Sequence, residues 1–134
     1  MASKYLSLFV VLCLSRSLVE ITLADVSTTF ITNDLIGKTL SIPKFFLDNL
    51  ESCHVIYPNG IMYEAFPNNQ LPPGPISFLN AVQPFVSCAI GFLGAGVEYS
   101  GTYELISVVQ HTSENYRSLT RQRFHLTLVE SNPW

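Results

Sequence analysis

The chain has 134 residues, of which 48% are hydrophobic and only 13% are charged, and its formal net charge is −3. This length is sufficient for one domain and too short for two. The high apolar and low charged content excludes an intrinsically disordered chain. The acidic balance argues against a nucleic-acid-binding protein, which needs a basic surface to displace counterions from phosphates.

Residues 1–24 have the pattern of a secretory signal peptide. Lys4 provides the positive charge near the N-terminus, and an apolar run covers residues 5–14. This run is well short of the roughly 20 residues that a membrane span needs. Residues 22–24 (Thr-Leu-Ala) offer small side chains at the positions that precede a cleavage bond. We therefore expect removal of the first 24 residues and secretion of one extracellular domain, residues 25–134.

The predicted mature domain retains two of the three cysteines, Cys53 and Cys88, because Cys13 leaves with the signal peptide. In an oxidising compartment two cysteines have a single pairing, so a Cys53–Cys88 disulfide is the default expectation, with two free buried thiols as the alternative. We expect no metal and no cofactor, because the histidines lack the spacing of metal ligands. These histidines are His54, His111 and His125. His54 and His125 are interpreted as solvent-facing strand residues, and His111 as a loop residue with no partner.

Alternating and β-branched segments predict strands along most of the mature domain. Asn59-Gly60 lies between two such segments and is a strong signal for a β-hairpin. The stretch 66–75 contains four prolines and is predicted to be a loop. Helical turns are expected at most in 44–50 and 114–119. The predicted strands cover 26–31, 38–42, 53–57, 61–64, 86–92, 101–109 and a last segment around 123–128. Short turn-bounded strands without a βαβ rhythm indicate an all-β fold, an antiparallel two-sheet sandwich.

Residues 98–105 (Glu-Tyr-Ser-Gly-Thr-Tyr-Glu-Leu) resemble the corner that precedes strand F of an immunoglobulin domain. Gly101 matches the turn glycine, and Tyr103 matches the corner tyrosine, whose hydroxyl bonds the backbone upstream. Leu105 stands where the second cysteine of the usual B–F disulfide would be. The segment 37–42 is similar to strand B, but no cysteine follows it. The chain thus resembles a small secreted immunoglobulin-like domain of the invertebrate type that lacks the usual B–F disulfide. An unrelated secreted β-sandwich or barrel is the alternative.

The sequences around Cys53 and Cys88 are similar to a further pattern of these domains, in which a cysteine on strand C pairs with one near strand E. Strands C and E lie in opposite sheets of the immunoglobulin sandwich. The resemblance therefore implies that the disulfide joins the two layers, as the missing one normally does.

The resemblance implies a recognition module that binds an extracellular or cell-surface protein through its loops or an exposed sheet face. The long connection between 63 and 78 is the candidate binding segment, because ordered loops on a rigid scaffold often carry recognition. Its apolar side chains are Tyr63, Phe66, Leu71 and Phe78. Alternatively, these side chains pack beneath the loop as part of the core.

A basic cluster has two interpretations: an anionic-partner patch, or a solvated hairpin in which Arg123 protects an edge strand. This cluster is Arg117, Arg121 and Arg123.

The alternative function is that of a small secreted carrier, with an apolar ligand between the sheets. A cavity of several hundred Å³ between the sheets would favour the carrier, and a packed core would favour the recognition module. No catalytic residues are expected, and the protein is not expected to be an enzyme. A hydrolase would require a histidine within hydrogen-bond reach of both a serine and a carboxylate.

Overall fold

The computed structural model describes residues 19–31, 38–113 and 116–130. These residues form eight strands and one short 3₁₀ helix, and they contain no α-helix. The elements are β1 (Val19–Ile31), β2 (Lys38–Ile42), β3 (Asn49–Ile56), β4 (Met62–Phe66), β5 (Ile76–Phe78), β6 (Cys88–Phe92), η1 (Val97–Tyr99), β7 (Gly101–His111) and β8 (Tyr116–Val129). The prediction of an all-β protein is confirmed, as is the loop after β4.

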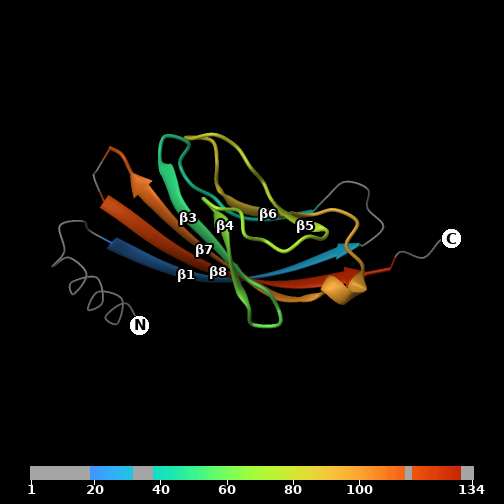
Figure 1. Ribbon diagram of the computed structural model, residues 1–134. Coiled ribbons are helices and arrows are strands. Elements are labelled where there is room, and N and C mark those ends of the chain that lie inside the picture. The colour runs from blue at the N-terminus through green and yellow to red at the C-terminus, as the bar shows by residue number, and fades with distance from the viewer. Residues whose placement is uncertain (1–18, 32–37, 114–115, 131–134) are drawn as a thin grey trace.

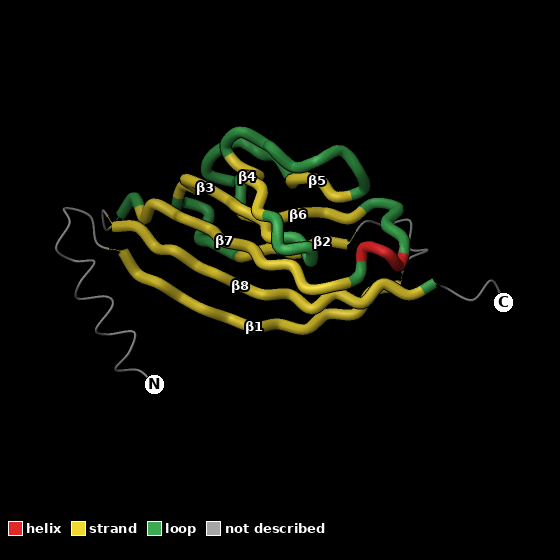
Figure 2. The backbone as a smooth tube through the Cα atoms, turned by 60° about the horizontal axis from the view of Figure 1, so that its bottom comes forward, coloured by secondary structure: helices red, strands yellow, loops and turns green. Residues whose placement is uncertain are grey.

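The strands form two sheets that lie face to face, as Figure 1 shows. The larger sheet has the order β1-β8-β7-β3-β4, and the smaller has the order β2-β6-β5. All neighbouring strands are antiparallel except β1 and β8, which are parallel. Figure 2 shows β1 along the edge of the larger sheet beside β8. The predicted two-sheet sandwich is confirmed, and its antiparallel pairing holds for the described strands except at this edge. Parallel neighbours need a long crossover, and the rest of the domain provides it.

The core fills the space between the two sheets. Strand β8 illustrates its origin, because Phe124, Leu126 and Leu128 are buried while Arg123 and Thr127 are exposed. This period of two arises because successive side chains of a strand point to opposite faces. The fully buried apolar side chains from both sheets include Leu40, Val55, Ile90 and Leu105.

The predicted hairpin at Asn59-Gly60 joins β3 to β4. Gly60 has φ +86°, a conformation that glycine adopts without steric cost. Its N–H donates to the Tyr57 carbonyl at 2.8 Å, and the side-chain oxygen of Asn59 accepts the Ile61 N–H at 3.0 Å. The hairpin is therefore closed by the two residues that predicted it, through the positive φ of Gly60 and the side-chain hydrogen bond of Asn59.

The helical turns expected in 44–50 and 114–119 are not found among the described residues. Residues 49 and 50 begin β3, and residues 116–119 belong to β8. Pairing with β7 supplies the backbone hydrogen bonds of residues 49–50 and 116–119, whereas residues 45–48 form a single turn in which the Asp48 N–H donates to the Phe45 carbonyl at 3.0 Å. The short helix lies instead at Val97–Tyr99, between β6 and β7.

Strand β1 begins before the predicted cleavage bond. Residues 19–24 pair with 117–122 of β8, and residues 25–31 pair with 123–129. Cleavage after Ala24 would therefore leave the second half of the β1–β8 pairing in the mature domain. The apolar run 5–14 lies outside the described residues, and no helix within the described ranges is long and apolar enough to cross a bilayer.

Candidate functional site

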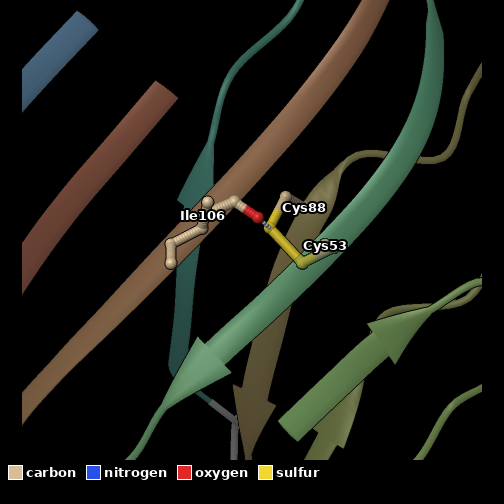
Figure 3. Close-up of a disulfide and its surroundings, with 3 residues drawn as sticks. All are labelled: Cys53, Cys88 and Ile106. Carbon is tan, nitrogen blue, oxygen red and sulfur yellow. Dashed lines mark hydrogen bonds between the residues drawn. A yellow bond between two sulfur atoms is a disulfide. The ribbon is translucent and has the colours of Figure 1, made fainter. Parts of the chain in front are cut away.

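A disulfide between Cys53 on β3 and Cys88 on β6 links the two sheets, as Figure 3 shows. The sulfur atoms are 2.09 Å apart and the Cα atoms 5.1 Å apart. Both residues are fully buried, and Cys88 Sγ lies 3.7 Å from the backbone oxygen of Ile106 on β7. The predicted pairing is confirmed. Because β3 and β6 belong to opposite sheets, the bond ties the layers together through the centre of the core.

The corner before β7 is held by Tyr103. Its hydroxyl donates to the backbone oxygen of Tyr99 at 2.6 Å, and the residue is only 1% exposed. Gly101 opens the strand at φ +146°, and a Cβ atom there would lie 2.7 Å from the ring of Pro58. Glycine is thus required twice at this position, by its backbone conformation and by the close approach of the β3–β4 turn.

The four side chains predicted to form a binding segment are half-buried. Phe66, Leu71 and Phe78 pack against the core, and the rings of Phe66 and Phe78 are 5.8 Å apart. The ring of Tyr63 lies edge-on to that of Tyr57, with 4.7 Å between their centroids. These contacts favour the alternative interpretation, in which the loop covers the core and the aromatic side chains fill the space beneath it.

The basic cluster lies on the outer face of the larger sheet and is largely neutralised. Arg117 Nε donates to Glu51 at 3.0 Å, and Arg121 forms two hydrogen bonds with Glu104. These hydrogen bonds, together with the charge of Glu104, raise the pKa of Arg121. Arg123 does not protect an edge strand, because β1 covers that side of β8. A hollow of about 420 Å³ beside the cluster has both signs of charge in its lining, which includes Asp25. Mixed charge of this kind does not favour an anion site.

Five of the six most exposed large apolar side chains among the described residues lie on two other connections; the sixth is Leu93. Phe45, Phe46 and Leu47 follow β2, and Val82 and Phe85 lie between β5 and β6. Their exposed fractions run from 62% to 80%. We call these five residues the apolar rim. The sequence does not distinguish them from core residues, because a short Phe-Phe-Leu segment is as typical of a buried turn as of an exposed one.

Hydrogen bonds link the β5–β6 connection to the β2–β3 connection and to the start of β3, and Figure 1 shows the two connections meeting at one end of the sandwich. The Lys44 ammonium donates to the backbone oxygens of Asp48 (2.8 Å) and Pro84. The Gln83 side chain donates to the Leu50 carbonyl at 2.6 Å and accepts the Leu50 N–H at 3.2 Å. Burial lowers the pKa of Lys44, and the nearby charge of Asp48 opposes this effect.

Behind the rim, His111 lies between a carboxylate and a serine. Its Nδ1 is 2.7 Å from Asp48 Oδ2, and its Nε2 is 2.7 Å from Ser118 Oγ. An ionised carboxylate can only accept, so Nδ1 carries a proton, and Nε2 of the neutral ring then accepts the Ser118 hydroxyl. Asp48 is 5% exposed, and the ring of Tyr116 stacks on the imidazole at 4.3 Å. We call Asp48, His111 and Ser118 the relay.

The interpretation of His111 as a loop residue without a partner is wrong. It ends β7, where the hairpin register pairs it with Tyr116 of β8 and places Ser118 on the same inward face. His125 faces outward as expected, but it also has partners, Thr102 at 3.0 Å and Asp25 at 2.9 Å. Within the described ranges, no three His, Cys, Asp or Glu side chains are grouped as metal ligands.

A cleft of about 370 Å³ opens beside the relay, between the larger sheet and the connection after β2. Its lining combines apolar side chains with hydroxyl groups. The residues include Ile42, Pro43, Val109, Ser107, Ser118 and Thr120. The cleft opens between the inner faces of the two sheets at one end of the sandwich, since Ile42 belongs to β2 of the smaller sheet and Val109 and Ser118 belong to the larger one. At the centre of the sandwich, Val55, Ile90 and Leu105 are fully buried and fill the space between the sheets.

No family model matches the chain, and no curated protein sequence matches it significantly. Its fold, however, is similar to solved structures. The Ig1 domain of mouse SynCAM 2 superposes with a TM-score of 0.52 at 15% identity, over 80% of this chain and 94% of that chain. Murine CRIg superposes with a TM-score of 0.52 at 7% identity, over 76% of this chain and 91% of that one. The chain has an immunoglobulin-like fold.

The order of the immunoglobulin-like strands identifies β2 with strand B, β3 with C, β6 with E and β7 with F. The disulfide therefore connects strands C and E, and neither β2 nor β7 contains a cysteine. Leu40 on β2 and Leu105 on β7 belong to the apolar core cluster. The disulfide thus joins the two sheets through strands C and E, and not through strands B and F as the usual one does.

Proposed function

We propose that this immunoglobulin-like domain is a secreted recognition module whose apolar rim binds an extracellular or cell-surface protein. The observation that carries the proposal is the exposure of five large apolar side chains on two connections that hydrogen bonds hold together. Large apolar side chains that gather, exposed, on neighbouring connections mark interaction sites. The sandwich beneath it is rigid and packed, which limits the entropy lost on binding.

The partner's contact surface should be apolar and weakly charged. The rim presents aromatic and aliphatic side chains, and the ammonium of Lys44 behind it is occupied by backbone oxygens. Aromatic side chains that become buried at the centre of an interface dominate binding energy, and truncating one costs roughly 2 kcal/mol or more. Phe45 and Phe85, one on each connection, are the expected anchors.

The test is a binding screen of the purified mature domain against displayed extracellular proteins, followed by affinity measurement with the partner found. Phe45→Ser and Phe85→Ser should each weaken binding by about 30-fold, the equivalent of roughly 2 kcal/mol. Leu93→Ser is the matched control, because Leu93 is 66% exposed and follows the other end of β6. Binding that survives both rim variants but is lost in Leu93→Ser would place the interface elsewhere and overturn the proposal.

Secretion is part of the proposal. A disulfide at the centre of the core is typical of proteins that fold in an oxidising compartment, and it supports export. Intact-mass measurement of the protein exported by transfected cells should show a chain that begins at Asp25 and has no free thiol. A full-length chain retained inside the cells would contradict removal of residues 1–24.

The carrier remains a second candidate because of the cleft beside the relay, whose volume is at the small end of the usual range for ligand pockets, roughly 300–1,000 Å³. The opening of this cleft between the ends of the two sheets supports the carrier, whereas the packed centre of the core favours recognition. Val109→Trp would fill the cleft, so saturable binding of a fluorescent fatty acid that is lost in this variant would establish the carrier function. Recognition rather than catalysis is the principal role that we propose.

A further inference from the structure

We propose that Ser118 is a nucleophile that accepts acyl groups from small apolar esters, with His111 as its general base and Asp48 as the group that orients the imidazole. This activity goes beyond protein recognition and does not depend on it. Its basis is the relay, in which each ring nitrogen of His111 has one partner at 2.7 Å. A base oriented by a carboxylate and hydrogen-bonded to a hydroxyl is the arrangement that activates a serine.

Burial separates the relay from an ordinary surface network. The side chains of Asp48 and His111 are 7% and 18% exposed, so water competes little for their hydrogen bond. The groups around the imidazole are Asp48 from the β2–β3 connection, Ser118 and Tyr116 from β8, and Lys44 beside Asp48. An ionised Asp48 stabilises the imidazolium that forms when His111 takes the serine proton.

The cleft gives the nucleophile a place for a substrate. Ser118 is part of its lining, and Ile42, Pro43 and Val109 provide apolar surface for an acyl chain. Ser107 and Thr120 also line the cleft and are the hydroxyl groups available to an oxyanion there, whereas the ammonium of Lys44, which lines it too, donates to backbone oxygens. Hydroxyl donors are weaker than a preorganised pair of backbone N–H groups, so we expect slow acyl transfer and a preference for activated esters.

The reaction needs no cofactor and no redox partner. Ser118 Oγ attacks the ester carbonyl, and a new C–O bond forms while the Oγ proton moves to His111 Nε2. The tetrahedral intermediate collapses, the bond to the alcohol breaks, and the departing oxygen takes the proton from Nε2. Water then attacks the acyl-serine with the same base, which releases a carboxylic acid and restores the hydroxyl.

His125 provides an internal comparison. It also lies between a carboxylate and a hydroxyl, Asp25 at 2.9 Å and Thr102 at 3.0 Å. This trio is on the outer face of the larger sheet, and the side chains of His125 and Asp25 are 44% and 61% exposed. Asp25 lines the hollow of about 420 Å³ beside the basic cluster, but neither His125 nor Thr102 is part of the lining of that hollow or of the cleft beside the relay. If the buried environment activates the hydroxyl, Ser118 should react and Thr102 should not.

The experiment treats the purified mature domain with a short-chain alkyl fluorophosphonate, which transfers its phosphonyl group to an activated serine and releases fluoride. Peptide mass spectrometry should locate the adduct on Ser118 of the wild-type protein, and Ser118→Ala should abolish labelling. His111→Gln should slow labelling by about 100-fold, the lower end of general-base effects. His125→Gln, the matched control, should leave the rate unchanged. p-Nitrophenyl butyrate serves as the ester probe and should follow the same ranking.

A purely structural role for the relay predicts different results. Wild-type labelling should increase with pH, because a general base acts in its unprotonated form, and this increase should be absent in His111→Gln. The adduct is mapped on the wild-type chain, so the test holds even if Ser118→Ala does not fold. Failure to label Ser118, labelling spread over exposed serines, or equal rates in wild type and His111→Gln would each overturn the proposal. A variant that loses partner binding but is still labelled at Ser118 would affect the recognition proposal only and would leave the proposed nucleophile unchanged.

Discussion

Removal of the disulfide tests how much of the stability depends on one covalent link between the sheets. The bond closes a loop between residues 35 positions apart in the sequence. On the chain-entropy model, a loop of this length restricts the unfolded chain by about 13 cal/mol/K, which is about 4 kcal/mol at 25 °C. Domains of this size are stable by roughly 5–15 kcal/mol in total. The double variant Cys53→Ala/Cys88→Ala should therefore lose a large part of its free energy of unfolding.

The variant also loses packing, because both cysteines are fully buried. We use Val86→Ala as the control, since Val86 is equally buried and its truncation removes side-chain volume without a cross-link. The double variant should fall by about 4 kcal/mol or more in urea unfolding, and its Tm by roughly 15 °C. Val86→Ala should cost roughly 1–3 kcal/mol. A loss in the double variant no larger than that of the control would refute the cross-linking argument.

Three further predictions concern the corner and the connections. Tyr103→Phe removes the hydrogen bond to the Tyr99 carbonyl and should lower the free energy of unfolding by about 1–2 kcal/mol in urea melts. Burial, with a smaller effect from neighbouring tyrosines, raises the pKa of Tyr57 and Tyr103 to about 12 from their ordinary 10.0. As pH rises, these tyrosines therefore ionise in the unfolded chain before they ionise in the folded one. The stability that they contribute is complete below pH 10 and is lost as pH rises toward 12. Urea unfolding midpoints that stay unchanged between pH 10 and 12 would contradict this prediction. Gln83→Ala removes the side chain that hydrogen-bonds the N–H and the carbonyl of the buried Leu50, and it should lower the free energy of unfolding by about 1–3 kcal/mol. An unchanged Tm in thermal melts would show that water replaces the amide.

Much of the fold could be predicted because its signals are local. Alternation identified the buried face of β8, and Asn59-Gly60 identified the hairpin between β3 and β4. The motif around Gly101 and Tyr103 pointed to the corner that the structure shows. Each of these features depends on residues within a few positions of one another, where backbone propensity and side-chain period decide the conformation.

The candidate site could not be predicted in the same way. Exposure of the rim depends on which apolar segments the smaller sheet leaves uncovered, and Phe45 has the same character as a core phenylalanine. The relay joins residues 63 positions apart (Asp48 and His111), and its serine is placed by the register of a hairpin. A shift of that register by one residue would turn Ser118 to the opposite face of β8.

The amino-acid sequence by itself determined that the chain is built of strands, that Asn59-Gly60 closes a hairpin, and that the two cysteines of the mature domain have a single pairing, because propensity, spacing and count are properties of the linear chain. Only the tertiary structure decided that β1 runs parallel to β8 and that a histidine lies between an aspartate and a serine beside a cleft. These arrangements arise from packing two sheets around one core, where the burial of apolar surface selects among registers and contacts that are equivalent in the linear chain.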